Sequence, residues 1–160
     1  MADYRARVCW KRGANESFVD ERYSRAHSWH FDGGLEVPAS SSPHVVPLPF
    51  SDEHAVDPEE AFVASLSSCH MLFFLSMAAA KGHVVDTYED NASGRMSKNE
   101  NGKMFVSVVT LRPRVRFAGN APDSDAIASL HHAAHESCFI ANSVRSEIQC
   151  LPELAEKSNK

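Results

Sequence analysis

The sequence lacks the features that mark several common classes of partner and compartment. Its 16 basic residues are outnumbered by 21 acidic ones, which gives a formal net charge of −5. A chain without a basic excess is not typical of proteins that bind nucleic acid or an anionic membrane, so we expect neither partner. The N-terminal segment MADYRARVCW has charges but no apolar stretch behind them. We therefore expect no secretion signal and a cytoplasmic location.

The sequence also lacks a CxxC pair, an internal repeat and any low-complexity segment. Its four cysteines, Cys9, Cys69, Cys138 and Cys150, are widely separated, which is not typical of a disulfide scaffold or a zinc ribbon. The length of 160 residues, of which 43% are hydrophobic, suits one domain over residues 1–160 with a sizeable core. The charged segment from about residue 152 to 160 is predicted to be a loose tail.

The stretch from Asp57 to Gly82 carries the strongest helix signal in the chain. Asp57 suits the N-cap, Pro58 suits the first helical position, and Glu59 suits the positive end of the helix dipole. Gly82 is a typical residue just beyond a helix end. Serines and a histidine interrupt the apolar run too often for a membrane span, so we predict a core helix of a soluble protein. The polar side chains between its ends are those of Ser65, Ser67, Ser68, Cys69, His70 and Ser76.

The other segments predict strands and one further helix. Tyr4–Trp10 and the aromatic segment 18–37 have strand-like spacing, which places Arg25 on an early strand. The segments 84–96 and 104–117 are predicted to be two strands of a hairpin, joined at Asn101-Gly102, with an edge or bulge at Pro113.

A second helix is predicted to begin after Asp123 or Ser124 as cap and to bury Cys138 on its apolar face. The segment RSEIQC is predicted to be a last short strand. This order of elements predicts an α+β fold.

Cys69 is the residue in the predicted core helix that could carry chemistry. A nucleophilic cysteine must be a thiolate, and burial disfavours the thiolate unless a cation lies nearby. Arg25 is a good candidate because its planar fork can bridge a thiolate and a carboxylate, and Glu59 lies roughly 80° around the helix from Cys69. The alternatives are that Cys69 is inert core packing, or that a strand arginine supplies the cation. The strand arginines are Arg112, Arg114 and Arg116.

Three segments of the chain resemble a known family. The run DPEEAFVASLSSC resembles the NPEELL…C motif of the OsmC/Ohr family, the osmotically inducible and organic hydroperoxide resistance proteins. The run HHAAHESCFIANS resembles that family's second motif, a helix ending in cysteine. The run YSRAHSWHFDGG places Arg25 about where the family's catalytic arginine precedes an Asp-Gly turn.

The resemblance implies both a fold and an activity. The fold would have two long central helices packed against β-sheets in an intertwined homodimer. The activity would be a thiol-dependent peroxidase that reduces organic hydroperoxides, with an external dithiol as reductant and no cofactor or metal. Cys69 would be the peroxidatic cysteine and Cys138 the resolving cysteine, while Arg25 would activate the thiolate and Glu59 would orient Arg25. Apolar walls that favour organic peroxides would come from Phe62, Leu66, Phe73 and Phe74.

Several other interpretations of the same residues stay open. A non-enzymatic dimer that binds a small apolar ligand would use the same pocket. His131 and His135 lie one helical turn apart and could bind a metal with His132, although surface or interface histidines explain the same pattern. A hydrolase that uses Cys69 and His70 is disfavoured because adjacent helix residues point about 100° apart. Two cysteines are interpreted as spectators, namely Cys9 and Cys150.

Overall fold

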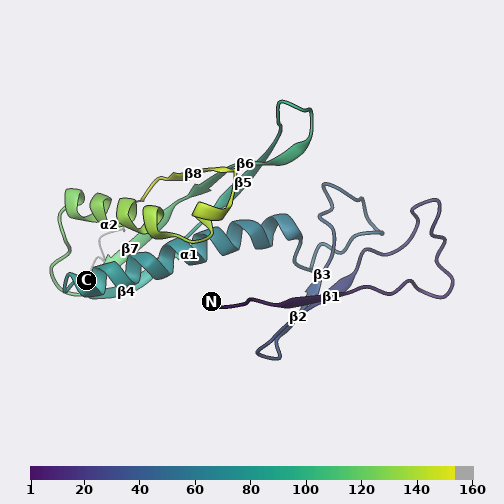
Figure 1. Cartoon of the computed structure of the whole chain (residues 1–160), viewed down its shortest axis with the longest axis horizontal. Coiled ribbons are helices and arrows are strands. Elements are labelled where there is room, and N and C mark those ends of the chain that lie inside the picture. The colour runs from purple at the N-terminus through teal and green to yellow at the C-terminus, as the bar shows by residue number, and fades with distance from the viewer. Residues whose placement is uncertain (154–160) are drawn as a thin grey trace, which may run out of the picture. The chain divides into compact units, whose positions relative to one another are not determined.

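A computed structural model of the chain describes residues 1–153. The described backbone falls into two compact units, a first unit of Met1–Ala61 and a second unit that begins at Phe62. In chain order, the described elements, labelled as in Figure 1, are β1 (Ala6–Cys9), β2 (His27–Phe31), β3 (Glu36–Ala39), α1 (Pro58–Ala80), β4 (Val85–Asp90), β5 (Ser93–Lys98), β6 (Met104–Leu111), β7 (Pro113–Phe117), α2 (Ser124–Ser137), the 3-10 helix η1 (Ala141–Ser143) and β8 (Glu147–Cys150). The predicted α+β class is confirmed.

The first unit contains an antiparallel sheet of the order β1-β2-β3. A turn joins β2 to β3, and Gly34 adopts a φ of 83° there, which suits a residue without a Cβ. The prediction that Arg25 lies on a strand is wrong, because β2 begins only at His27. The backbone N–H of Arg25 instead donates to the carbonyl of Phe50 at 2.8 Å, so loop contacts hold this residue outside the sheet.

Helix α1 has the predicted boundaries. The Asp57 carboxylate accepts the backbone N–H of Glu60 at 2.8 Å, and the Glu60 carboxylate accepts the N–H of Asp57 at 3.4 Å. Each side chain thus accepts a backbone N–H that would otherwise lack a partner at the start of the helix, an arrangement known as a capping box. The helix ends at Ala80, and Gly82 follows with a φ of 78°. The N-cap and C-terminal glycine signals in the sequence are therefore confirmed.

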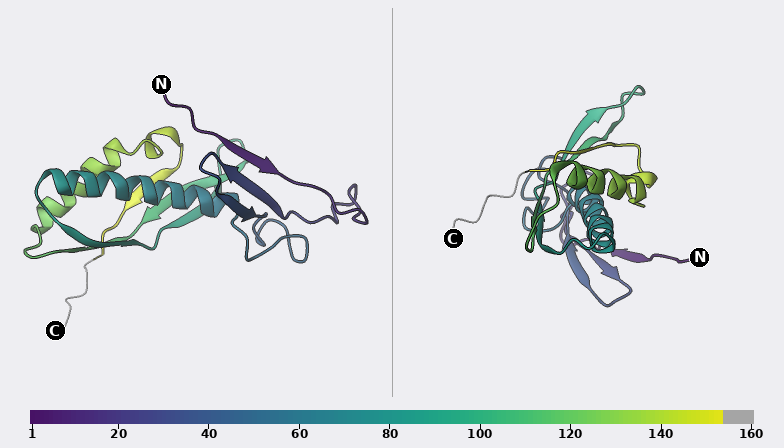
Figure 2. Two further views of the ribbon diagram at one scale, coloured as in Figure 1. Left: turned by 90° about the horizontal axis from the view of Figure 1, so that it is seen from below. Right: turned by 90° about the vertical axis from the view of Figure 1, so that its left-hand side faces the viewer.

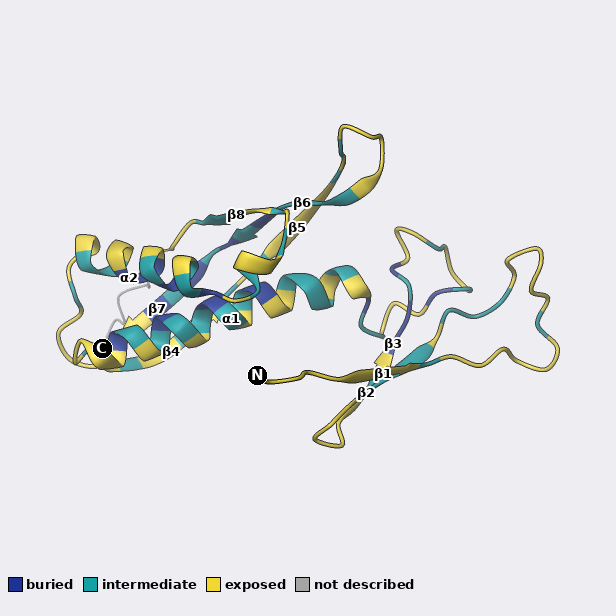
Figure 3. Cartoon of the chain, in the orientation of Figure 1, coloured by how far each residue is buried: buried dark blue, intermediate teal, exposed yellow. Residues whose placement is uncertain are grey.

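In the second unit, α1 buries a single stripe of side chains. The buried residues Leu66, His70, Phe74 and Ala78 recur every four positions, whereas Leu72 is 60% exposed. Figure 3 shows the buried positions along α1. Among the described residues, α1 is the one helix long and apolar enough to cross a membrane by length and composition. Its buried stripe makes it the core helix of a soluble fold.

The stripe of α1 contributes to two apolar clusters. One cluster joins Phe74 and Ala78 to residues of α2 and β7, and the other joins Leu66 to residues of β6. The helices α1 and α2 lie on the same side of these strands (Figure 2). The partners of the stripe in the two clusters are Val109, Leu111, Val115, Leu130 and Ala134.

Each arm of the predicted hairpin proves to be two strands. The segment 84–96 forms β4 and β5, and the segment 104–117 forms β6 and β7, so the prediction of single strands is wrong. The outer strands pair as β4-β7, and the inner strands form a sheet of the order β5-β6-β8, in which β6 and β8 are parallel. At the break, the Asp90 carboxylate accepts the N–H of Arg112 at 2.6 Å, and Pro113 begins β7. The hairpin turn itself is confirmed, with Gly102 at a φ of 73°.

The C-terminal elements follow the predicted order. Asp123 caps α2 by accepting the N–H of Ala126 at 2.8 Å, and β8 is present as predicted. The tail is paired at Glu153, whose N–H donates to the carbonyl of Pro113 and whose carboxylate lies 2.9 Å from the Arg114 guanidinium. The rest of the predicted loose tail, residues 154–160, lies outside the described part of the chain.

Candidate functional site

The second unit brings Cys69 and Cys138 together. Cys69 lies at mid-length of α1 and is partly exposed, while Cys138 follows the last turn of α2 and is 1% exposed. Both are free thiols. The two side chains come from different parts of the unit, α1 and the end of α2, and the Cys69 thiol lies close enough to Cys138 to raise its pKa. A pair of thiols predicted from sequence to react together is thus adjacent in the fold.

The surroundings of Cys138 keep its thiol protonated. Burial, and after it the interaction with Cys69, raise the pKa of Cys138 to about 11. The backbone N–H of Ala141 donates to the Cys138 sulfur at 3.4 Å, which opposes part of this effect. At neutral pH, Cys138 is therefore a neutral S–H group that can donate to negative charge on the Cys69 sulfur.

Each of the two cysteines has a phenylalanine close to it in the sequence. Phe73 follows Cys69 by one helical turn, and Phe139 follows Cys138 directly. These rings meet edge to face at 5.0 Å between centroids, and Phe139 is 70% exposed. An apolar surface therefore accompanies the dithiol.

Two of the predicted wall residues are not available to a substrate. Leu66 is 1% exposed and Phe74 is 0% exposed, because both pack into the core clusters. The prediction that they line the substrate pocket is wrong. Phe62 lines a different pocket, of about 340 Å³, beside β6 and the segment that leads to β8.

Arg25 and Glu59 line one pocket within the first unit. The pocket has a volume of about 460 Å³ and mixes aromatic, hydroxyl and charged side chains. Its lining consists of Val8, Trp10, Phe18, Tyr23, Arg25, His27, Ser40, Ser41, Pro58 and Glu59. The role of Glu59 in orienting Arg25 stays a prediction.

Local contacts hold the guanidinium of Arg25. It lies 3.8 Å from the centroid of the Tyr23 ring and donates to the carbonyls of Glu21 and Tyr23 at 2.5 Å each. Tyr23 is fixed in turn by Trp10, at 5.4 Å between ring centroids. Among the described residues, ion pairs within 4.0 Å join His30 to Glu36 and Arg114 to Glu153, so none joins Arg25 to Glu59. In the described part of the chain, backbone carbonyls and an aromatic ring therefore hold the Arg25 guanidinium, and Glu59 lines the same pocket.

The sequence left two arrangements of histidines open, a Cys-His hydrolase site and a metal site on α2, and the structure shows neither among the described residues. His70 contacts His131 at 3.0 Å, so its ring engages α2 while Cys69 engages Cys138. This divergence disfavours a Cys-His hydrolase. His131 is 4% exposed, so the interpretation of it as a surface histidine is wrong. In the described part of the chain, the potential metal ligands that cluster are His70, His131 and Cys150, without His132 or His135.

The elements described so far define an α+β protein in which two helices present a pair of neighbouring thiols. A protein-family model described as OsmC-like protein matches residues 51–151. The chain therefore belongs to the OsmC-like protein family. The resemblance seen in its sequence motifs is confirmed.

Solved structures extend the comparison over nearly the whole chain. An OsmC-like protein of unknown function from Vibrio cholerae is 54% identical, with a TM-score of 0.91 over 96% of this chain and 99% of that one. An organic hydroperoxide resistance protein from Elizabethkingia anophelis is 16% identical, with a TM-score of 0.70 over 98% of both chains. The organic hydroperoxide resistance protein OhrB of Bacillus subtilis is 21% identical, with a TM-score of 0.63 over 94% and 98%. The last two likenesses concern the fold. No curated protein sequence matches the chain.

Proposed function

We propose that this protein is a thiol-dependent peroxidase that reduces organic hydroperoxides through Cys69 and Cys138. The observation that carries the proposal is the adjacency of a partly exposed cysteine on α1 and a buried, protonated cysteine at the end of α2. The exposed ring of Phe139 beside this pair favours a substrate with an apolar group. Family membership supports the same activity, since the family includes organic hydroperoxide resistance proteins.

The proposed chemistry has three balanced steps. The Cys69 thiolate attacks one peroxide oxygen, the O–O bond breaks, and the alkoxide leaves and takes a proton to become an alcohol. The Cys138 sulfur then attacks the Cys69 sulfenic acid, which forms the disulfide and releases water. An external dithiol exchanges with this disulfide, so that Cys69 and Cys138 return as thiols and the reductant leaves as its own disulfide.

The hydrogen bond from Cys138 has a role in the first step. While Cys69 is a thiolate, the Cys138 S–H donates to it, and this interaction adds to burial in raising the pKa of Cys138. Oxidation of Cys69 to the neutral sulfenic acid removes that negative charge. Cys138 then ionises more readily, at the point where its thiolate is needed.

Peptide mapping after peroxide treatment tests the proposal. One equivalent of cumene hydroperoxide is expected to convert the reduced protein into a form with a Cys69–Cys138 disulfide, and a dithiol is expected to restore turnover. The readout is mass spectrometry of the digested protein together with the rate of peroxide consumption. Recovery of both cysteines as unmodified thiols, with no peroxide consumed, would contradict the peroxidase.

We further propose that Arg25 supplies the cation for Cys69 and that Glu59 orients Arg25. The support is the motif resemblance and the pocket within the first unit that both side chains line. Arg25→Met is expected to slow the reaction with cumene hydroperoxide at pH 7 by tenfold or more, because a nearby cation commonly favours a thiolate by about one to three pH units. Stopped-flow measurement of single turnovers would record the change, and Glu59→Gln is expected to show a smaller one.

Arg12→Met is the matched control for Arg25→Met. Arg12 also donates to backbone carbonyls in the first unit, but it does not line the pocket. This variant removes the same charge and is expected to react at the wild-type rate. Equal slowing in both variants would remove Arg25 from the mechanism and leave only a general effect of charge.

The remaining parts of the proposal concern assembly and location. We propose that the chain acts in the cytoplasm as an intertwined homodimer and that residues 1–160 form one domain. The exposed Leu72 and Phe139 support an assembly that covers apolar surface, and the family match at residues 51–151 includes parts of both units.

A second candidate function is a non-enzymatic dimer that binds a small apolar ligand, which the aromatic pocket of the first unit favours. Wild-type turnover equal to that of an inactive cysteine variant would select this second function.

A further inference from the structure

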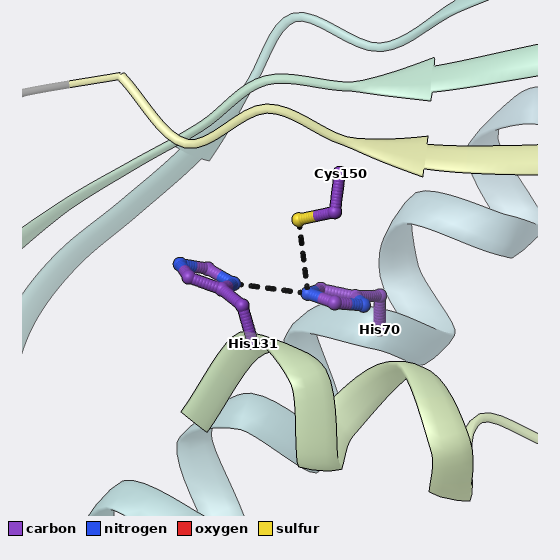
Figure 4. A group of neighbouring side chains, drawn as sticks. All are labelled: His70, His131 and Cys150. Carbon is purple, nitrogen blue, oxygen red and sulfur yellow. Dashed lines mark hydrogen bonds between the residues drawn. The ribbon is translucent and has the colours of Figure 1, made fainter. Parts of the chain in front are cut away.

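A second group of side chains with ligand chemistry lies in the second unit, apart from the two cysteines of the proposed peroxidase. His70 comes from α1, His131 from α2 and Cys150 from β8, and their side chains point toward one another (Figure 4). His70 Nε2 lies 3.0 Å from His131 Nδ1 and 3.8 Å from the Cys150 sulfur. One nitrogen from each histidine and the sulfur all lie within 4.8 Å of one another.

These polar groups are buried although apolar packing alone does not favour their burial. His70 is 1% exposed and His131 is 4% exposed. The outer nitrogens, His70 Nδ1 and His131 Nε2, are buried without a hydrogen-bond partner among residues 1–153, and the same holds for the hydroxyl of Tyr88. Burial of polar atoms that lack partners costs free energy, so packing alone does not favour this cluster. Its inner atoms, two imidazole nitrogens and one sulfur, are the atom types that bind metal ions, and they converge on one another.

We propose that His70, His131 and Cys150 bind one Zn²⁺ ion, which ties α1, α2 and β8 together. Zinc binds imidazole nitrogen at about 2.0–2.1 Å and thiolate sulfur at about 2.3 Å, so a tetrahedral site places two nitrogens about 3.3 Å apart and nitrogen and sulfur about 3.6 Å apart. The observed separations of 3.0 Å and 3.8 Å differ from these values by a few tenths of an ångström. Three protein ligands leave one coordination position for water or another oxygen.

The surrounding charges favour a divalent ion. Asp90 interacts electrostatically with both His70 and Cys150. Its carboxylate accepts hydrogen bonds from Ser67 and from the backbone of Arg112, which fix it beside the cluster. Two neutral imidazoles, one thiolate, one carboxylate and Zn²⁺ sum to zero charge, whereas a monovalent ion such as Cu⁺ would leave one negative charge in the core.

Cobalt substitution provides a direct test, because Co²⁺ reports its ligands by absorption in sites that bind Zn²⁺. The metal-free, reduced wild type is expected to bind one Co²⁺ per chain with a sulfur-to-cobalt charge-transfer band, and Zn²⁺ is expected to displace it. Cys150→Ser is expected to lose the band. The double variant Cys69→Ser/Cys138→Ser is expected to keep it, which separates this site from the proposed peroxidase.

A second variant and a second measurement test the site independently if Cys150→Ser does not fold. His131→Phe keeps a ring beside Phe74, with which His131 stacks at 4.3 Å, and is expected to weaken Zn²⁺ binding at least about a hundredfold. Zn²⁺ at about 100 times its dissociation constant is expected to raise the melting temperature of the wild type by roughly 5–10 °C and that of His131→Phe by much less. Circular dichroism establishes that each variant is folded.

Three outcomes would overturn the zinc site. The first is retention of the cobalt band in folded Cys150→Ser, and the second is its loss in the double variant, which would assign the metal to Cys69 and Cys138. The third is a wild type that retains no metal after dialysis and shows no change in melting temperature. Selective retention of Cu⁺ over Zn²⁺ would overturn the charge argument and the choice of a divalent ion.

Discussion

Replacing Cys69 with serine is expected to reduce the turnover of cumene hydroperoxide by at least about a thousandfold, because a neutral hydroxyl cannot replace a thiolate as the nucleophile. The measurement is peroxide consumption with a dithiol reductant in excess. Cys9→Ser is the control, since Cys9 is a thiol of the first unit that contacts Arg7 at 3.1 Å and has no assigned role. Activity that survives in Cys69→Ser and disappears in Cys9→Ser would move the chemistry to the N-terminal strand.

Cys138→Ser distinguishes the two proposed roles within the pair. This variant is expected to consume one equivalent of peroxide and then stop, because Cys69 reaches the sulfenic acid and finds no second thiol to condense with. Excess peroxide is expected to carry Cys69 on to the sulfinic acid, which mass spectrometry detects as two added oxygens. Continued turnover at the wild-type rate would show that the external thiol attacks Cys69 directly and that Cys138 does not resolve the intermediate.

Local signals predicted α1 well, because the residues that set its ends act within a few positions. The capping box of Asp57 and Glu60 and the glycine after the last turn are both present. The breaks in the two long strand segments depend on distant partners instead. Asp90 and Arg112 meet across 22 positions, so the end of β4 and the break before β7 are fixed by one contact between chain segments that no local pattern contains.

The same distinction applies to the candidate sites. Cys69 and Cys138 were predicted from motifs, and the fold places them together. From the sequence, Cys150 is interpreted as a spectator because it lies near the chain end, and no local pattern reveals its contact with His70, which lies 80 positions away. The sequence of α1 does contain a signal for His70, which lies at the same spacing of four positions as Leu66, Phe74 and Ala78. A polar residue in such a stripe indicates a buried polar partner elsewhere in the chain.

The buried histidine pair is expected to make the metal-free protein strongly sensitive to acid. Burial lowers the pKa of both His70 and His131 from 6.5 to about 4, with a smaller contribution to His70 from His135 that Asp90 opposes. Because the folded-state values lie below the unfolded ones, the unfolded chain takes up protons first as the pH falls. The free energy of unfolding therefore has its full value above about pH 6.5 and decreases as the pH falls toward 4.

The size of this effect makes it measurable. At about 1.4 kcal/mol per pKa unit, each shift corresponds to a loss of about 3 kcal/mol, and the coupled pair to about 3–6 kcal/mol, which is a large part of the stability of a typical domain. Urea unfolding at pH 7, 6 and 5 in the presence of a chelator would record the decline. His131→Phe is expected to remove about half of it, since one titrating ring is replaced by an apolar ring that still stacks on Phe74.

His132→Phe is the matched control for this acid effect, because His132 is the next residue of α2 and is exposed. Protonation of carboxylates affects all three proteins alike, so only a difference between their curves reports the buried pair. The wild type and His132→Phe are expected to lose stability in parallel, while His131→Phe declines less steeply. Parallel curves for all three proteins would mean that His70 and His131 admit protons in the folded state, and that water reaches the cluster despite its burial.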